Sequence, residues 1–305
     1  MSRFIAARVL RGLLVIIGVT MVVFFVTRVI ADPAVVMLPD DSSAETIETF
    51  RASLGYDRAI PVQFVEFTRD AATLDFGDSL MQRRPALEIV AERFPRSIVL
   101  AVSSLALAVM LSILLGVLGA LRPGSWVDHA TSTTALLGLS MPQFWLGLLL
   151  VFAFGVHLGW FPTSGFGGIE HMVLPAVALA LPAAGRLTLI TRSSMIEELS
   201  RSYVTTARSK GLGSSYIIRR HVLRNAAVPL VTLTGWELVR ALAGYTIVVE
   251  AVFAYPGIGS LALDSVDRQD LPVIQATVFA VAVVVVVVNI LIDVLYVRVD
   301  PRIKL

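Results

Sequence analysis

Cysteine is absent from this chain of 305 residues, and histidine occurs only 4 times. The absence of cysteine excludes disulfides and thiolate metal ligands, and the histidines lack the paired spacing of metal sites. The sequence also has no Gly-x-x-x-x-Gly-Lys-Ser/Thr loop and no Gly-x-Ser-x-Gly turn, the signatures of an ATP-phosphate cradle and of a serine hydrolase. We therefore expect no catalytic residue, no metal site and no cofactor in this chain.

Charged residues are also scarce. They make up 16% of the chain, against 56% hydrophobic residues, which is too few for an ordinary soluble domain. The formal net charge of +2 gives no sign of nucleic-acid binding. This composition predicts an all-α membrane protein that contacts lipid and has no nucleic-acid partner.

Six apolar stretches are long enough to cross a hydrocarbon core of about 30 Å, which takes roughly 20 helical residues. They cover residues 9–31, 98–121, 131–156, 172–190, 226–250 and 272–296. Pro142 lies inside the third stretch and should kink it, because a mid-helix proline removes one backbone hydrogen bond. The valine run 283–288 is rich in β-branched residues, but the length and low charge of its stretch favour a membrane helix.

Basic residues alternate between the loops in a way that predicts orientation. Arg3, Arg8 and Arg11 precede the first span, and Arg298, Arg302 and Lys304 end the chain. Because lysine and arginine concentrate in cytoplasmic loops, we expect both termini in the cytoplasm. The chain then divides into residues 1–31 with the first span, an extracytoplasmic insertion over 32–97, and a core of five spans over 98–305.

The longest polar segment of the second half, residues 193–225, is strongly basic. Between two spans, such a segment belongs on the cytoplasmic side. Ala207 and Gly211 lie four residues apart, a spacing that predicts one shared helical face. Small side chains there would let another protein approach the backbone. A loop that only fixes membrane orientation is the alternative interpretation.

This segment resembles the EAA loop of the membrane subunits of bacterial ABC importers, which reads Glu-Ala-Ala, three residues and Gly. Thr205-Thr206-Ala207 stands in place of Glu-Ala-Ala, Gly211 is the glycine, and the later Pro229 comes further along than in the general pattern. The residues that match the dipeptide and oligopeptide permease branch are the run 207–212, the run 221–229, Thr191–Met195, Tyr255–Gly259, Asp293–Tyr296 and Asp300–Ile303. The resemblance covers essentially the whole chain.

The resemblance implies a type I ABC importer permease fold, with six membrane helices and an extracytoplasmic insertion after the first. It implies that the chain forms half of the path for di- or oligopeptides in a bacterial inner membrane. The implied partners are a second homologous permease subunit, two ATP-binding subunits that hold ATP and Mg²⁺, and an extracytoplasmic substrate-binding protein. The residues implied to couple to an ATPase subunit are Thr205, Thr206, Ala207, Arg208, Lys210, Gly211 and Leu212.

Four polar residues are candidates for the translocation path: Gln143, Glu237, Arg240 and Glu250. Glu237 comes about 16 Å along its span at 1.5 Å per residue, near the midplane, where charge is costly and often functional. Arg240 follows at i+3, so a self-neutralised structural pair is the alternative. Gln143 lies beside the Pro142 kink and either lines a pore or packs between spans. Glu250 either closes an outer gate, holds the turn at Pro256-Gly257, or is an interfacial cap at the outer end of its span.

Other functions are also open at this stage. The cargo of the same transporter class could be nickel, glutathione or an oligosaccharide, although the absence of thiolates and the few histidines weigh against nickel. A membrane receptor or scaffold would need a signalling domain, and an intramembrane enzyme would need a buried nucleophile or metal pair. Gly77–Leu80 spells Gly-Asp-Ser-Leu, a hydrolase motif, but the Asp-x-x-His of that class is missing.

Overall fold

The computed structural model describes residues 2–30, 38, 42–53, 55 and 57–299. Within these ranges the secondary structure is helical apart from one isolated bridge between Asp78 and Pro85. The prediction of an all-α protein is therefore confirmed. Arg302, Lys304 and the matching run 300–303 lie outside the described residues.

Five helical stretches of the described chain are long and apolar enough to cross a membrane. They are Ala6–Thr27, Ala86–Leu121, Ile169–Leu199, Ser214–Val252 and Leu271–Val294. Each contains most or all of one predicted span, and the valine run 283–288 is helical as predicted. The span predicted to start at residue 98 lies in a longer helix that starts at Ala86 and contains Pro95.

The third predicted span differs from the prediction. Helix α6 (Trp126–Ser140) and helix α7 (Gln143–Leu150), which continues into the π-helical segment η1 (Val151–His157), are bent by 105° at their junction. Pro142 precedes α7 with an extended backbone, and so does Met141 before it. The predicted bend at Pro142 is confirmed, and it is sharper than a kink within one helix. Proline disfavours helical geometry in the residue before it, so the helix stops and restarts.

The chain divides into two compact units, and each is described by itself. The first unit comprises residues 1–97 and 256–287, and the second comprises residues 98–255 and 288–305. The first unit holds α1 (Ser2–Ile30), α3 (Ala44–Ser53), α4 (Ile60–Ala72), α13 (Ile258–Asp267), the start of α5 (Ala86–Leu121) and most of α14 (Leu271–Val299). The division into residues 1–31, 32–97 and 98–305 stays a prediction.

In the first unit, the segment between α4 and α5 is tied to the start of α14. The buried Ser79 hydroxyl donates to the carboxylate of Asp270, which also accepts the Leu80 N–H at 3.1 Å. Asp270 in turn begins α14, since its carbonyl accepts the Ile274 N–H at 3.0 Å. The serine of the Gly-Asp-Ser-Leu run is thus a hydrogen-bond donor to a buried carboxylate that anchors this segment.

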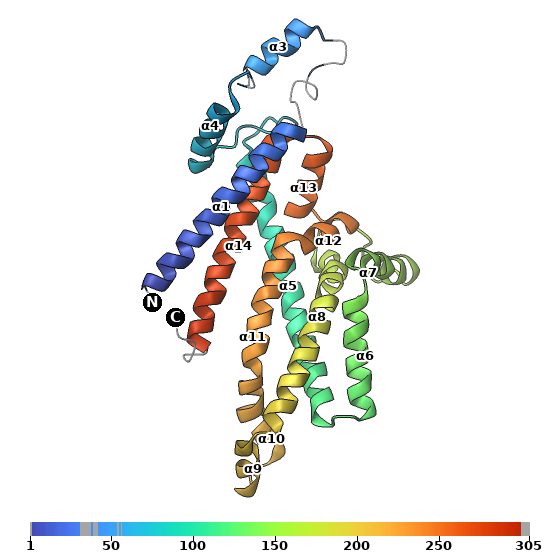
Figure 1. Cartoon of the computed structure of the whole chain (residues 1–305). Coiled ribbons are helices and arrows are strands. Elements are labelled where there is room, and N and C mark those ends of the chain that lie inside the picture. The colour runs from blue at the N-terminus through green and yellow to red at the C-terminus, as the bar shows by residue number, and fades with distance from the viewer. Residues whose placement is uncertain (1, 31–37, 39–41, 54, 56, 300–305) are drawn as a thin grey trace. The chain divides into compact units, whose positions relative to one another are not determined.

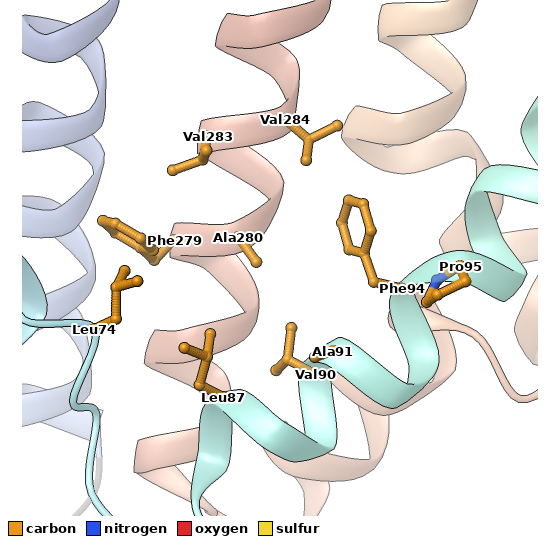
Figure 2. A pocket seen from close by; sticks show the side chains of 10 residues that line it. All are labelled: Leu74, Leu87, Val90, Ala91, Phe94, Pro95, Phe279, Ala280, Val283 and Val284. Carbon is orange, nitrogen blue, oxygen red and sulfur yellow. The ribbon is translucent and has the colours of Figure 1, made fainter.

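An apolar cavity of about 350 Å³ lies between α5 and α14 in the first unit. Figure 2 shows Phe279, Ala280, Val283 and Val284 of α14 on one side and the first turns of α5 on the other. Its lining side chains are all hydrocarbon, so the cavity offers shape and no polar recognition.

The second unit is built around α8 (Ile169–Leu199), which packs against α6, α7 and α11 (Leu223–Arg240). Figure 1 shows α8 between α6 and α11, and small residues make this packing close. A Cβ on Gly185 would lie 2.4 Å from the Ala135 carbonyl oxygen of α6. Ala180, Ala183 and Ala184 are buried beside it in a cluster that also includes Leu187 and Leu230. Small residues serve membrane helices in this way, because backbones can then approach closely.

The remaining elements of the second unit are short. They are α9 (Ser202–Ser209), α10 (Ser214–Ile217), the π-helical segments η2 (Ile218–Val222) and η3 (Ala241–Tyr245), and α12 (Thr246–Val252). From α10 to α12 the chain is helical without a break, and two stretches of it, η2 and η3, are π-helical. Such turns are frequent at functional sites.

Candidate functional site

A buried ion pair joins α8 to α11. Arg186 donates from Nε to Glu237 Oε1 and from Nη2 to Glu237 Oε2, both at 2.7 Å. The Glu237 side chain is 5% exposed and that of Arg186 is 25% exposed. Two parallel bonds of this kind are the strongest geometry for a guanidinium and a carboxylate. The ion pair therefore offsets much of the desolvation free energy of the buried Glu237 carboxylate.

Arg240 is the lesser partner of Glu237. Its Nη1 lies 3.4 Å from Glu237 Oε1, and its side chain is 48% exposed. The sequence offered a self-neutralised Glu237–Arg240 pair as the alternative to a path role, and the structure contains that ion pair. The i, i+3 spacing does bring the two together, but α8 supplies a cation with two shorter bonds.

A signal for Arg186 was present in the sequence. Arg186 is the one charged residue within the predicted span 172–190. An ionisable residue inside a span faces a partner or a water-filled path, because lipid does not solvate it. The same argument that selected Glu237 therefore selects Arg186.

A cavity of about 320 Å³ opens where α7, α8 and η3 meet. Gln143, Arg186 and Tyr245 line it, together with the apolar side chains Leu139, Met141, Phe144, Pro182 and Val248. A smaller hollow shares Arg186 and Tyr245 with this cavity and is also lined by Glu237. The structure thus connects two predicted path residues, Gln143 and Glu237, through Arg186.

The other two predicted path residues lie apart from this cavity. Arg240 and Glu250 are not among the residues that line it. Glu250 is fully buried in α12, and its carbonyl accepts the Tyr255 N–H at 2.9 Å. Its roles as an outer gate, as an interfacial cap or in holding the turn at Pro256-Gly257 stay predictions.

The predicted coupling segment is a short helix fixed on the chain's own core. Val204 and Ala207 of α9 are buried, and they belong to a cluster with Met195, Ile217, Val222 and Ala226. The opposite face of α9 and the turn after it are exposed. The exposed residues of the predicted coupling set are Thr205, Thr206, Arg208, Lys210, Gly211 and Leu212.

Gly211 is not on the face of α9 that carries Ala207. The helix ends at Ser209, and Gly211 has φ +77°. The Leu212 N–H donates to the Ala207 carbonyl at 3.2 Å and the Gly211 N–H to the Arg208 carbonyl at 2.9 Å, which is a Schellman cap. The predicted shared face of Ala207 and Gly211 is therefore wrong: Ala207 faces inward, and Gly211 terminates the helix.

Hydrogen bonds link α9 to the end of α8 and the start of α11. The Tyr203 hydroxyl donates to Glu198 Oε2 at 2.6 Å and accepts from Asn225 Nδ2 at 3.3 Å. Partial burial raises the pKa of the Tyr203 phenol, and the bond to the Glu198 carboxylate raises it further. The phenol is then a donor at neutral pH, and Tyr203 connects α9 to both long helices.

A second buried ion pair braces the same end of α8. Arg192 binds Asp128 of α6 with Nε and Nη2, the latter at 2.7 Å, and Asp128 also accepts the Gly124 N–H at 2.8 Å. Asp128 is 3% exposed. The turn between α5 and α6 is therefore held against α8 close to the coupling segment.

Two family profiles match the chain. That of the binding-protein-dependent transport system inner membrane component matches residues 110–305. That of the N-terminal part of such membrane components matches residues 1–101.

Relatives of similar length match along the whole chain. The glutathione transport system permease protein GsiC of Salmonella typhi is 37% identical over 305 residues, which cover 100% of this chain and 99% of that protein. The oligopeptide transport system permease protein AppB of Bacillus subtilis is 36% identical over 316 residues, which cover 100% of each.

Solved structures show the same fold. A chain of the MetNI methionine ABC transporter, solved in inward-facing conformations, is 17% identical, with a TM-score of 0.55 over 70% of this chain and 96% of that one. A chain of an amino acid ABC transporter solved with histidines is 15% identical, with a TM-score of 0.54 over 69% and 94%. These likenesses show the type I permease fold.

Proposed function

The chain belongs to the family of binding-protein-dependent transport system inner membrane components, and we propose that it is one permease subunit of an ATP-driven peptide importer. The observation that carries this proposal is the full-length similarity to permeases of oligopeptide and glutathione transport. Glutathione is itself a peptide, so both relatives favour a peptide cargo over nickel or an oligosaccharide. The chain is a multi-pass membrane protein of a transport family.

The other subunits of the transporter are separate partner proteins. A second homologous permease subunit completes the path as a heterodimer, and an extracytoplasmic binding protein delivers the peptide. Two ATP-binding subunits hold ATP and Mg²⁺ and perform all hydrolysis, so this chain is no enzyme. It lies in a bacterial inner membrane with both termini in the cytoplasm.

The exposed face of α9 and the turn at Gly211 contact an ATP-binding subunit. This assignment is supported by the shape of the segment, which is anchored by Val204 and Ala207 and exposed at Thr205, Arg208 and Lys210. The bonds of Tyr203 to Glu198 and Asn225 then carry motion to α8 and α11. ATP stabilises the conformation of the transporter to which it binds more tightly. That difference in affinity between the two conformations drives the cycle.

Reconstitution tests the proposal. The chain, its second permease subunit and the two ATP-binding subunits are placed in liposomes with the binding protein and radiolabelled tri-alanine, dialanine or glutathione. We expect uptake of at least one peptide that requires ATP, the binding protein and this chain. ATP-dependent uptake of nickel or an oligosaccharide with none of any peptide would refute the cargo, and an absence of all ATP-dependent uptake would refute the importer.

A further inference from the structure

We propose that Arg186, Gln143 and Tyr245 form a binding site for a carboxylate of the cargo inside the second unit. This inference deepens the proposed function, and it rests on that function for the statement that the cargo is a peptide. The site is the 320 Å³ cavity between α7, α8 and η3, and each of its three polar residues comes from a different element.

The polar groups of the cavity have unused hydrogen-bonding capacity. Arg186 donates hydrogen bonds from Nε and Nη2 to Glu237. Its Nη1, the Gln143 amide and the Tyr245 hydroxyl make no hydrogen bond to any residue in the described ranges. A guanidinium nitrogen, an amide and a phenol can each donate to a carboxylate oxygen. Polar groups converging on an apolar cavity are the usual makeup of a ligand site.

The charge of the site selects an anion. Two guanidinium groups, Arg186 and Arg240, surround one carboxylate, Glu237, so the three sum to a formal charge of +1. The carboxylate is 5% exposed, whereas the two cations are 25% and 48% exposed. Of these three groups only Arg186 lines the cavity, so the wall that a cargo meets there is cationic. A metal cation would be repelled there, and a neutral sugar would leave the charge uncompensated.

Local backbone geometry supports a specialised role for Tyr245. It ends the π-helical segment η3, where the Thr246 hydroxyl donates to the Ala241 carbonyl five residues back at 3.1 Å. A π-helical turn inserts an extra residue and rotates the side chains that follow it. Here it accompanies the placement of Tyr245 on the cavity with Arg186 of α8.

Cysteine chemistry tests the charge of the cavity, because the chain has no cysteine of its own. In the assembled four-subunit complex, Gln143→Cys supplies one thiol in the cavity. Its labelling rate is measured with the anionic sulfonatoethyl and the cationic trimethylammonioethyl methanethiosulfonates. We expect the anionic-to-cationic rate ratio to be about tenfold higher than in a background that also carries Arg186→Met, Glu237→Gln and Arg240→Gln.

A single substitution controls for misfolding of the triple variant. Arg240→Gln alone also brings the net charge to zero but leaves the charged Arg186 on the cavity, so it should lower the rate ratio partway. A ratio unchanged in both backgrounds would overturn the proposal.

Peptide protection then identifies the chemical group. Tri-alanine should slow labelling of the cysteine at position 143 more than tri-alanine amide at equal concentration. The amide of Ala-Asp-Ala distinguishes the source: protection equal to that by tri-alanine indicates any carboxylate, and weaker protection indicates the peptide C-terminus. Equal protection by tri-alanine and its amide, or none by either, would overturn the site.

Labelling requires no transport, so the two proposals fail separately. A complex that takes up no peptide but shows the charge-dependent ratio would contradict the importer alone. A complex with normal peptide uptake and a charge-independent ratio would contradict the carboxylate site alone.

Discussion

At the scale of single residues, the Arg186–Glu237 pair shows why charge is tolerated between these helices. An isolated carboxylate in a membrane protein is expensive, and only a partner with good geometry offsets the loss of hydration. The two 2.7 Å bonds provide that geometry. Arg240 adds a longer contact from a half-exposed side chain, which is worth much less.

The first prediction separates these two partners of Glu237. Arg186→Met leaves Glu237 buried without its main cation and should cost about 3 kcal/mol or more of folding free energy. Arg186→Met with Glu237→Gln removes both charges and should restore most of the loss. The yield of monodisperse protein and its thermal midpoint in detergent measure both effects.

Arg240→Met is the matched control for this prediction. Its contact is 3.4 Å and its side chain is half exposed, so its midpoint should stay close to that of the unaltered chain. A larger loss for Arg240→Met than for Arg186→Met would show that the i, i+3 pair is the important one after all.

At the scale of elements, α9 has one face buried against the chain's own core and an opposite face that is exposed. Its eight residues are too few to form a stable helix alone, so its buried residues must hold it in place. The Schellman cap then turns the chain sharply at Gly211. A Cβ at Gly211 would meet nothing within 4 Å, so the requirement for glycine within this chain is conformational and not steric.

The second prediction uses that distinction. Asparagine and aspartate both tolerate positive φ and have almost the same shape. Gly211→Asn should keep coupling largely intact, whereas Gly211→Asp adds an anion directly after the exposed Arg208–Lys210 segment and should weaken binding of the ATP-binding subunit. The measurements are co-purification of that subunit and stimulation of ATP hydrolysis by the loaded binding protein.

Ser214→Asp controls for added negative charge in the same segment. Ser214 is exposed and begins α10, where an acidic residue is favourable near the helix N-terminus. This variant should insert and couple nearly normally. Indistinguishable coupling in Gly211→Asn and Gly211→Asp would count against an electrostatic contact at Gly211.

At the scale of the whole molecule, membrane physics made the spans the most predictable feature. Hydrocarbon thickness sets helix length, so apolar runs locate five of the helices, including the valine-rich one. Contacts between residues distant in sequence were harder to predict. Nothing local to Glu237 points to Arg186, which lies 51 residues earlier, although its own charge within a span was a usable signal.

Two differences between prediction and structure came from extending a helix through a residue that ends it. Pro142 was expected to bend a helix, but it begins a new one. Ala207 and Gly211 were placed on one face by their spacing, but the glycine after Lys210 is a helix-end signal. In both cases the local chemistry of proline or glycine outweighs periodicity.

The last prediction concerns the path of the chain through the membrane. One candidate span separates Ser164 from Ser214, and another separates Ser214 from Asp264. All three residues are exposed, and Ser164 avoids the positive φ of Gly165. Single cysteines at 164 and 264 should therefore react with an impermeant thiol reagent in intact cells, whereas one at 214 should react only after lysis.

A fourth cysteine distinguishes the two topologies that the bend at Pro142 allows. If α6, α7 and η1 form one broken span, Arg122 lies on the side opposite Ser164; if they form a re-entrant loop, both lie on the same side. Six spans with both termini in the cytoplasm require the first arrangement. Arg122→Cys should thus be protected in intact cells, like Ser214→Cys. Labelling at position 122 with protection at 214 would leave five crossings and place the two chain ends on opposite sides.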